Sequence, residues 1–357
     1  MNKDKIRLRS FILDTKNALT QLEGCGYLDD SILDFFLGFI KEFCISHNNY
    51  TWNIFSTLFN VLLSKCNKKE EYINMRRWIK RLTFPLLLHD FILIPIHSNT
   101  CHWWILIICF PKKGIKIIND SNKDKNINIL NKYNENDECI LKSSIGWIIC
   151  LDSLGYTNVK KSEKQATIIN ILKFLNIEYN YNNEYKNMRK SGFIFSENIS
   201  NDWYIIYNPY NIPNQYNGYD CGLYLIEYIH WIFHYNIDLI NSMIKKTLKS
   251  NIKWFSNNWI KNRRISLKLI IIKIRDNPDW IYNIKIKQEI LSIFDNGLEI
   301  EYNNNELKYL TYNFSNSCQN NYNSELYIPN NSGPISSFLA NKLDTLSNRL
   351  NKYKRDS

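Results

Sequence analysis

The amino-acid sequence predicts an α+β fold, with a helical lobe first, a central mixed sheet next and one buried helix packed between them. The first part of the chain has the apolar spacing of helices, the middle contains short runs that are apolar on both faces, and residues 220–235 are apolar almost all round. The 357 residues, 45% of them hydrophobic and 14% aromatic, can bury a sizeable core.

The helical lobe begins with residues 28–40, where apolar side chains recur at the spacing of one helix face. Asp29 or Asp30 can cap the start of that helix through a side-chain oxygen. We expect further helices at 54–65, 76–82 and 163–175, and two more within 240–275.

Three short apolar runs, each bounded by turn residues, have the pattern of buried central strands. They are FILIPI at 91–96, WWILIICF at 103–110 and IGWIICL at 145–151. IKII at 115–118 is a further candidate strand, and the polar segment 119–144 is expected to be an insertion.

These patterns divide the chain into three segments. A short polar N-terminal lead covers 1–19, the folded domain covers 20–275, and an Asn-rich C-terminal extension with little periodicity covers 276–357.

The net charge of +11 has two explanations. Asn, Ile, Lys and Tyr are frequent while Gly is scarce, a bias that an AT-rich genome imposes on codons. Attraction to an acidic partner is the other explanation. No nucleic-acid-binding signature is present, so we expect no nucleic-acid partner.

The nine cysteines are odd in number and form no CxxC pair, which argues against a disulfide framework and against a zinc site. We therefore expect no metal, and a reducing compartment such as the nucleus or cytoplasm. The N-terminal sequence has no secretory apolar region, and the run at 103–110 is too short to span a bilayer. A soluble protein is the expectation.

Cys221 has the setting that a catalytic nucleophile needs. It follows Asp220 and precedes Gly222 at the start of the most hydrophobic helix. The positive end of a helix dipole stabilises a thiolate, and a glycine leaves room for a substrate backbone. The same residues also fit a helix that begins with a capping Asp and a small buried Cys.

Gln215 lies six residues before Cys221, across a turn-forming segment. Its amide can donate to the oxygen that becomes negative when a thiolate attacks a carbonyl. An ordinary solvated loop glutamine is the alternative.

His102 begins the strand at 103–110 and is the candidate base, although a histidine at a strand start is often structural. Its competitors are His47, His89, His97, His230 and His234. Asp152 ends the strand at 145–151 and is the candidate acid that orients the base. Asp120 competes for that role, but polar residues follow it, and a carboxylate there would prefer water. The order His, Asp, Cys differs from that of papain-type enzymes, whose Cys comes first.

Taken together, these residues resemble the SUMO-specific (ubiquitin-like-protein-specific) cysteine protease family. The resemblance rests on a His-Trp pair, a strand ending in Asp-Ser, and a Gln six residues before the Cys of Asp-Cys-Gly, here at 102–103, 152–153, 215 and 220–222. It extends over about 20–275 and includes the segments 27–35, 54–59 and 77–96. The long insertion and the Lys-Trp-Phe at 253–255 make the chain most similar to the branch that trims SUMO chains.

The resemblance implies a papain-like thiol protease fold of the ubiquitin-like-protease type, with no cofactor. It implies Cys221 as nucleophile, His102 as base, Asp152 as orienting acid and Gln215 in the oxyanion hole. By the same resemblance Trp103 roofs a narrow tunnel that admits a Gly-Gly tail.

Two positions depart from the family pattern. Tyr27 stands where many members have Trp, and Asn214 where many have Gln. We expect Tyr27 to line the substrate site together with Trp103 and Gly222.

The implied reaction is hydrolysis of the isopeptide bond between SUMO and a lysine, through a thioester acyl-enzyme. SUMO and SUMO-conjugated proteins are then the partners, and no membrane is required. The alternatives are a protease for NEDD8 or ubiquitin and a catalytically inactive SUMO-binding module. Acetyltransferases with the same nucleophile logic are a further alternative, but they tend to carry Glu as the orienting acid.

Overall fold

A computed structural model describes residues 4–44, 50–80, 82, 84–98, 101–117, 145–155, 160–209, 212–245 and 254–296. Within these residues the central sheet has five strands in the order β3-β4-β5-β7-β9. The inner pairs β4–β5 and β5–β7 are antiparallel and the outer pairs β3–β4 and β7–β9 are parallel, so the sheet is mixed, as predicted. The strands are β3 (Trp52–Ile54), β4 (Phe91–Ser98), β5 (His102–Cys109), β7 (Gly146–Leu151) and β9 (Trp203–Tyr207).

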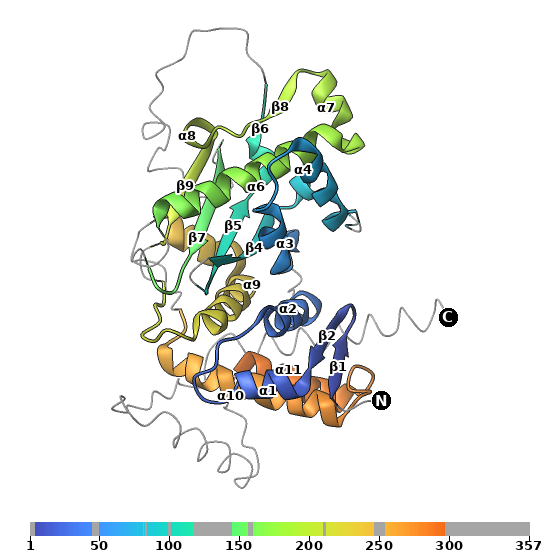
Figure 1. Ribbon diagram of the computed structural model, residues 1–357, viewed down its shortest axis with the longest axis vertical. Helices are drawn as coiled ribbons and strands as arrows, with labels where there is room; N and C mark the ends of the chain where they lie inside the picture. Colours follow the sequence, from blue (N-terminus) through green and yellow to red (C-terminus); the bar gives the residue numbers. More distant parts are fainter. Residues whose placement is uncertain are drawn as a thin grey trace. The chain divides into compact units, whose positions relative to one another are not determined.

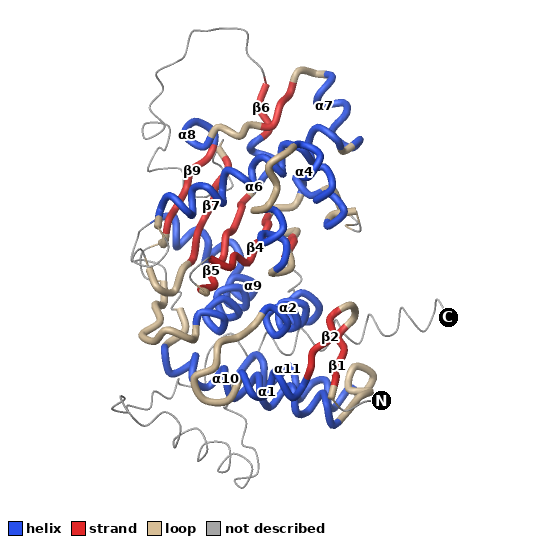
Figure 2. The backbone as a smooth tube through the Cα atoms, in the orientation of Figure 1, coloured by secondary structure: helices blue, strands red, loops and turns tan. Residues whose placement is uncertain are grey.

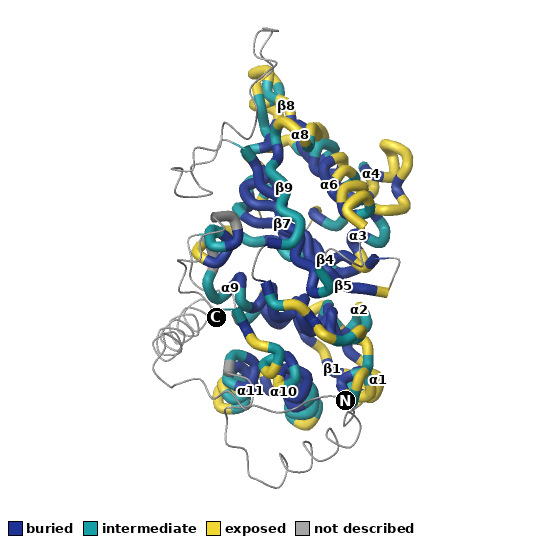
Figure 3. The backbone as a smooth tube through the Cα atoms, turned by 90° about the vertical axis from the view of Figure 1, so that its left-hand side faces the viewer, coloured by how far each residue is buried: buried dark blue, intermediate teal, exposed yellow. Residues whose placement is uncertain are grey.

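The three predicted central strands are confirmed as buried. All eight residues of β5 and all six of β7 are buried, and Figure 3 shows both strands in dark blue. Because side chains alternate along a strand, Ile105 and Ile107 enter the core on one face of the sheet, while Leu106 and Ile108 enter the core on the other.

Helices cover both faces of the sheet (Figures 1 and 2). One face packs against α3 (Leu58–Leu63), α4 (Lys69–Met75) and α6 (Lys161–Tyr181). The other face packs against α9 (Cys221–Lys245). Three further helices, α2 (Asp30–Phe39), α10 (Asn257–Asp276) and α11 (Ile284–Asn296), belong to the same hydrophobic cluster as α9. None of the described helices is long and apolar enough to cross a membrane.

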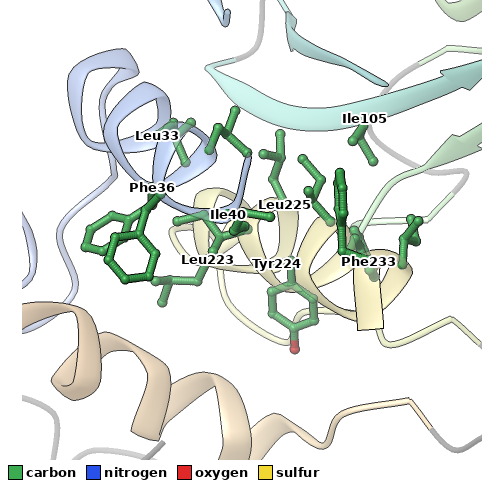
Figure 4. Packing of buried hydrophobic residues seen from close by; sticks show 14 of the residues in the cluster. Leu33, Phe36, Ile40, Ile105, Leu223, Tyr224, Leu225 and Phe233 are labelled. Carbon is green, nitrogen blue, oxygen red and sulfur yellow. The ribbon is translucent and has the colours of Figure 1, made fainter. Parts of the chain in front are cut away.

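The predicted buried helix is α9, which lies between α2 and the sheet. Figure 4 shows Leu223 and Leu225 of α9 among Leu33 of α2, Ile40 just after α2, and Ile105 of β5. The helical lobe, the sheet and the helix between them are therefore arranged as the sequence predicted.

Helix α2 starts where its predicted cap lies. The Asp29 side chain accepts a hydrogen bond from the Ile32 N–H at 3.1 Å, and it also accepts from Gln21 Nε2 at 2.6 Å. This cap fixes the point at which the chain enters the core, next to Tyr27 and Leu28.

The structure corrects the expected N-terminal boundary. Instead of a polar lead, the chain forms a hairpin of β1 (Lys5–Leu8) and β2 (Phe11–Asp14), followed by α1 (Thr15–Gln21). The reason is period-2 patterning, because Ile6, Leu8 and Leu13 alternate with polar residues and are buried.

The structure also corrects the expected end of the domain at residue 275. Helix α11 follows α10 and buries Ile290 and Phe294, and Trp280 in the connection is buried as well. These side chains belong to the same hydrophobic cluster as α2 and α9, so the folded core extends at least to the end of α11.

Several smaller elements differ from their predicted form. The expected helix at 54–65 is only Leu58–Leu63, because Trp52–Ile54 pairs with β4, and the one at 76–82 is a 3₁₀ turn at Arg76–Trp78. In place of two helices within 240–275, α9 continues to Lys245 and α10 supplies the rest. A second small sheet pairs β6 (Ile115–Ile117) with β8 (Phe193–Phe195), and two short helices are α7 (Lys186–Lys190) and α8 (Ile199–Asp202). The predicted insertion at 119–144 lies outside the described residues.

Candidate active site

Cys221 is the first residue of α9, and the preceding turn fixes where that helix starts. Asn217 Oδ1 accepts hydrogen bonds from the N–H groups of Tyr219 and Asp220, at 3.1 and 3.0 Å, and Asn217 Nδ2 donates to Asp220 Oδ2 at 2.8 Å. The Asp220 carbonyl then accepts the helical hydrogen bond from the Tyr224 N–H. Cys221 thus lies at the positive end of a 25-residue helix.

A buried arginine anchors this turn to the N-terminal lobe. Arg264 Nη2 donates to Asp220 Oδ1 at 2.6 Å, and Arg264 Nη1 donates to the carbonyls of Gln21 and Gly26, at 2.8 and 2.9 Å. The start of α9 and the segment that leads into Tyr27 are therefore held by one side chain of α10.

His102 and Asp152 meet because of the strand register. In the β5–β7 pair Ile105 lies opposite Leu151, so Asp152 lies one residue beyond the last pair, and His102 is its diagonal neighbour. His102 Nε2 and Asp152 Oδ1 are 2.6 Å apart, and both side chains are buried. The other ring nitrogen remains for the Cys221 thiol, to which His102 is also hydrogen-bonded.

These contacts set the charges of the site. Burial alone lowers the pKa of His102, but the hydrogen bonds with Asp152 and Cys221 outweigh it and raise that pKa to about 9. Burial tends to raise the pKa of Asp152, yet the hydrogen bond with His102 and the charge of Lys164 hold it below its usual value. At neutral pH the pair is an imidazolium beside a carboxylate; the imidazolium can give a proton to a leaving group, and the neutral imidazole that results can take a proton back.

Gln215 is held between Ser153, which follows Asp152, and Asn217, in the turn before α9. Its N–H donates to the Ser153 carbonyl at 2.8 Å, its Oε1 accepts from Ser153 Oγ at 2.5 Å, and its Nε2 donates to the Asn217 carbonyl at 2.7 Å. Gln215 is 7% exposed, so it is a fixed donor and not a solvated loop side chain.

Trp103, Tyr27 and Gly222 lie around Leu28, beside the start of α9. Trp103 Nε1 donates to the Leu28 carbonyl at 3.0 Å, and a pocket of about 730 Å³ is lined in part by Tyr27, Leu28 and Trp103. A Cβ atom on Gly222 would lie 3.0 Å from the Leu28 Cβ, so Gly222 packs directly against Leu28. Tyr27 is 57% exposed and forms the outer part of the lining.

Two of the competing histidines have other neighbours, while His47 lies outside the described residues. His97 packs against Trp103 with ring centroids 4.4 Å apart, and His230 lies further along α9, 3.4 Å from Asp295. Asp120 lies outside the described residues. In the described part of the chain no cluster of His, Cys, Asp and Glu could hold a metal ion.

Three further residues support the site, and the sequence analysis assigned a role to none of them. Ser153 holds Gln215, and Asn208 Oδ1 accepts from the Asp152 N–H at 2.8 Å. Lys164 of α6 places Nζ 2.7 Å from Asp152 Oδ2. A signal for Lys164 was present, because residues 164, 168, 171, 172 and 175 lie on one face of a helix.

Comparison with known proteins gives matches that include these residues. Residues 26–265 match the Ulp1 protease family, C-terminal catalytic domain. Ubiquitin-like-specific protease 2 of Schizosaccharomyces pombe is 25% identical over 317 residues, which cover 83% of this chain and 45% of that protein. Ubiquitin-like-specific protease 1C of Arabidopsis thaliana is 26% identical over 252 residues, which cover 67% of this chain and 36% of that protein.

Human sentrin-specific protease 7 is 24% identical over 302 residues, which cover 73% of this chain and 26% of that protein. The chain thus spans less than half the length of these curated relatives. A solved structure described as a de-sumoylating protease aligns with 83% of this chain and 98% of its own, with a TM-score of 0.48 and 18% identity.

The family match begins just before Tyr27 and ends at Ile265, so it takes in the helical lobe, the central sheet and α9. His102, Asp152, Gln215 and Cys221 all lie inside it. With two thirds of its length in this match, the chain belongs to the Ulp1 protease family and carries that family's C-terminal catalytic domain.

Proposed function

We propose that this chain is a cysteine isopeptidase that removes SUMO from lysine side chains of modified proteins. One observation carries the proposal: His102 Nε2 lies 2.6 Å from Asp152 Oδ1, and the pKa of His102 is raised both by Asp152 and by Cys221, the first residue of the buried helix α9. The names of its relatives, ubiquitin-like-specific and sentrin-specific proteases, support the choice of substrate class.

In the proposed reaction the Cys221 thiolate attacks the carbonyl carbon of the modifier's C-terminal glycine. His102 holds the proton from the thiol and gives it to the lysine amine as the C–N bond breaks, which leaves a thioester on Cys221. A water molecule, deprotonated by His102, then hydrolyses the thioester and restores the thiol. Asp152 keeps His102 oriented, and Gln215 Nε2 donates to the oxyanion.

The packing around Leu28 supports a substrate whose last residues are glycines. Trp103 donates to the Leu28 carbonyl and Gly222 packs against the Leu28 side chain, so little room is left beside them for the side chains of a substrate. Tyr27, at the exposed end, would contact the residues that precede this tail.

A protease for another modifier is the second candidate, because a Gly-Gly tail is common to SUMO, NEDD8 and ubiquitin. An inactive binding module is less well supported, because a binder has no need of a hydrogen-bonded Cys-His-Asp set. Trimming of SUMO chains remains part of the proposal, based on the long segment between His102 and Asp152.

The proposed place of action is the nucleus or cytoplasm. Among the described residues, Cys66, Cys101, Cys109, Cys150 and Cys221 have free thiols. A reducing compartment would keep these thiols free.

The test is a panel of SUMO, NEDD8 and ubiquitin probes that carry an electrophile at the C-terminus, scored for covalent adducts. We expect the SUMO probe to label the protein, and Cys221→Ser to abolish labelling. The matched control is Cys101→Ser, which removes an exposed thiol next to His102 and should leave labelling intact. Labelling by ubiquitin or NEDD8 alone would overturn the SUMO assignment, and labelling of Cys221→Ser would overturn the nucleophile.

A further inference from the structure

Helix α6 places a buried lysine against the proposed catalytic acid. Lys164 is 1% exposed, and its Nζ lies 2.7 Å from Asp152 Oδ2. The other carboxylate oxygen, Oδ1, is the one that contacts His102 Nε2, at 2.6 Å. Asp152 therefore lies between two cationic groups, and within the described residues no other acid forms an ion pair with Lys164.

Without Asp152, the position of Lys164 would be unfavourable for a charged side chain. Burying an ammonium group costs several kcal/mol. Lys164 is also in the first turns of α6, which starts at Lys161, and a cation near a helix N-terminus opposes the helix dipole. The Trp104 ring, 5.5 Å from Nζ, offsets a small part of this cost. The ion pair with Asp152 must supply most of the remainder.

We propose that Lys164 is a positioning residue for the reaction proposed above. Lys164 holds Asp152 Oδ2 so that Oδ1 faces His102, and the charge of Lys164 sets the pH range of the Cys221–His102 pair. This inference rests on the proposed function for its role in turnover, but its geometric basis is independent of the substrate.

Lys164 has two separable effects. As a partner, it stops the buried carboxylate from rotating away from His102, since Oδ2 would otherwise be a buried, unpaired oxygen. As a charge, it opposes the proton on His102 and favours the thiolate of Cys221. Its removal should therefore raise the pH at which the thiolate forms and also the pH at which His102 loses its proton.

The other ionisable groups around this cluster do not replace that charge. Burial raises the pKa of the Cys150 thiol, on β7, to about 12, and burial raises the pKa of the Tyr228 phenol, on α9, well above its usual value. Burial lowers the pKa of His97, on β4. All three groups are neutral at pH 7, so Lys164 is the cation that faces Asp152 from the side opposite His102.

The experiment compares Lys164→Met and Lys164→Gln with the wild-type protein, in the full chain. Lys161→Met, which removes an exposed lysine from the same helix, is the matched control. The first readout is the pH dependence of Cys221 alkylation by iodoacetamide, which needs no SUMO. The second is the pH dependence of kcat/KM for release of a fluorophore from the SUMO C-terminus.

We expect both limbs of the alkylation profile to move up by about one pH unit in both Lys164 variants, because the unit charge beside Asp152 is removed from a partly desolvated site. Lys164→Met should also lower kcat/KM at its own optimum by about tenfold or more. Lys164→Gln, which keeps a polar group on the side of Oδ2, should retain more of that activity. Lys161→Met should match the wild type in both readouts.

The proposal would be overturned if either Lys164 variant folds and its alkylation profile has the same two limbs as that of the wild type. Lys164 would then be a structural residue. Thermal melts identify a variant that does not fold, and Lys164→Gln, which keeps a polar group against Asp152, guards against that outcome. If the limbs move but the wild type releases no fluorophore from SUMO, the proposed substrate fails while the role of Lys164 stands.

Discussion

Ser153 Oγ lies 2.5 Å from Gln215 Oε1, while the Ser153 carbonyl accepts the Gln215 backbone N–H at 2.8 Å. A hydroxyl that donates to Oε1 and a carbonyl of Asn217 that accepts from Nε2 leave the amide only one orientation. The second N–H of Nε2 is then the one available to an oxyanion. Since Ser153 directly follows Asp152, a single turn positions both the proposed acid and the proposed oxyanion donor.

We expect Ser153→Ala to lower kcat by about tenfold with KM nearly unchanged, because a loosened donor is lost mainly in the transition state. Steady-state kinetics with a fluorogenic SUMO substrate would measure both constants. The matched control is Ser266→Ala, which removes a buried hydroxyl of α10 bonded to the Asn262 carbonyl. A change in KM alone would mean that Ser153 positions substrate and not Gln215.

Gln215→Ala should have a larger effect than Ser153→Ala, because it removes the donor itself. We expect kcat to fall by about 10²–10³-fold with little change in substrate binding. The same assay measures it, with the exposed Gln165→Ala as control. Equal losses in Gln215→Ala and Ser153→Ala would indicate that the hydroxyl, not the amide, is the group that matters.

Asp152→Asn should lower kcat/KM by about 10²–10⁴-fold while the protein keeps its fold, since an amide favours the wrong imidazole tautomer. Asp120→Asn is the comparison, and it should be nearly silent. Circular dichroism would check the fold of both variants. A silent Asp152→Asn together with an inactive Asp120→Asn would assign the orienting role to Asp120.

The proposed triad could be predicted because each member lies at the end of an element with a strong local signal. Cys221 opens an unusually apolar helix, and His102 and Asp152 flank strands that are apolar on both faces. Such strands are central in a sheet. Because β5 and β7 are antiparallel neighbours, the start of β5 lies beside the end of β7. Their hydrogen bonds then follow from the register.

The contacts that support the site could not be predicted in the same way. Lys164 and Arg264 are charged residues, which are mostly exposed, and their burial depends on partners distant in sequence, Asp152 and Asp220. Helix α11 did have a local signal in the sequence, since Asn283 stands at its N-cap position. In the structure the Asn283 side chain accepts from the Ile286 N–H at 3.2 Å. Its Asn-rich surroundings obscured that signal.

The pKa of His102, about 9, gives an expected pH dependence. A raised pKa means that the imidazolium persists through neutral pH, so kcat/KM should fall only as the pH rises through about 9. The stability supplied by the His102–Asp152 pair is complete below the ordinary pKa of about 6.5 and is lost over the same rise. A pH profile of kcat/KM, and of the thermal midpoint, would measure both. A basic limb near pH 6.5 in the wild type would contradict the charge-paired geometry.

The last expectation concerns the C-terminal boundary. A chain that ends at residue 275 loses the buried side chains of Trp280, Ile290 and Phe294, each worth about 1.5–3 kcal/mol when fully buried. It also loses the Phe294 carbonyl, to which the buried Arg263 donates. Since domains are stable by only about 5–15 kcal/mol, this truncation should unfold or aggregate.

A chain that ends at residue 296 keeps all of these contacts and should retain the wild-type urea midpoint and kcat/KM. Phe294→Ala in the full chain is the matched substitution, and it should cost about 3–5 kcal/mol of unfolding free energy, because Phe294 packs on Phe36, Phe39 and His230. Urea unfolding followed by tryptophan fluorescence would measure all three proteins. If the chain that ends at 275 unfolded at the wild-type urea concentration, α11 would be an accessory of the domain and not part of its core, and the boundary at 275 would stand after all.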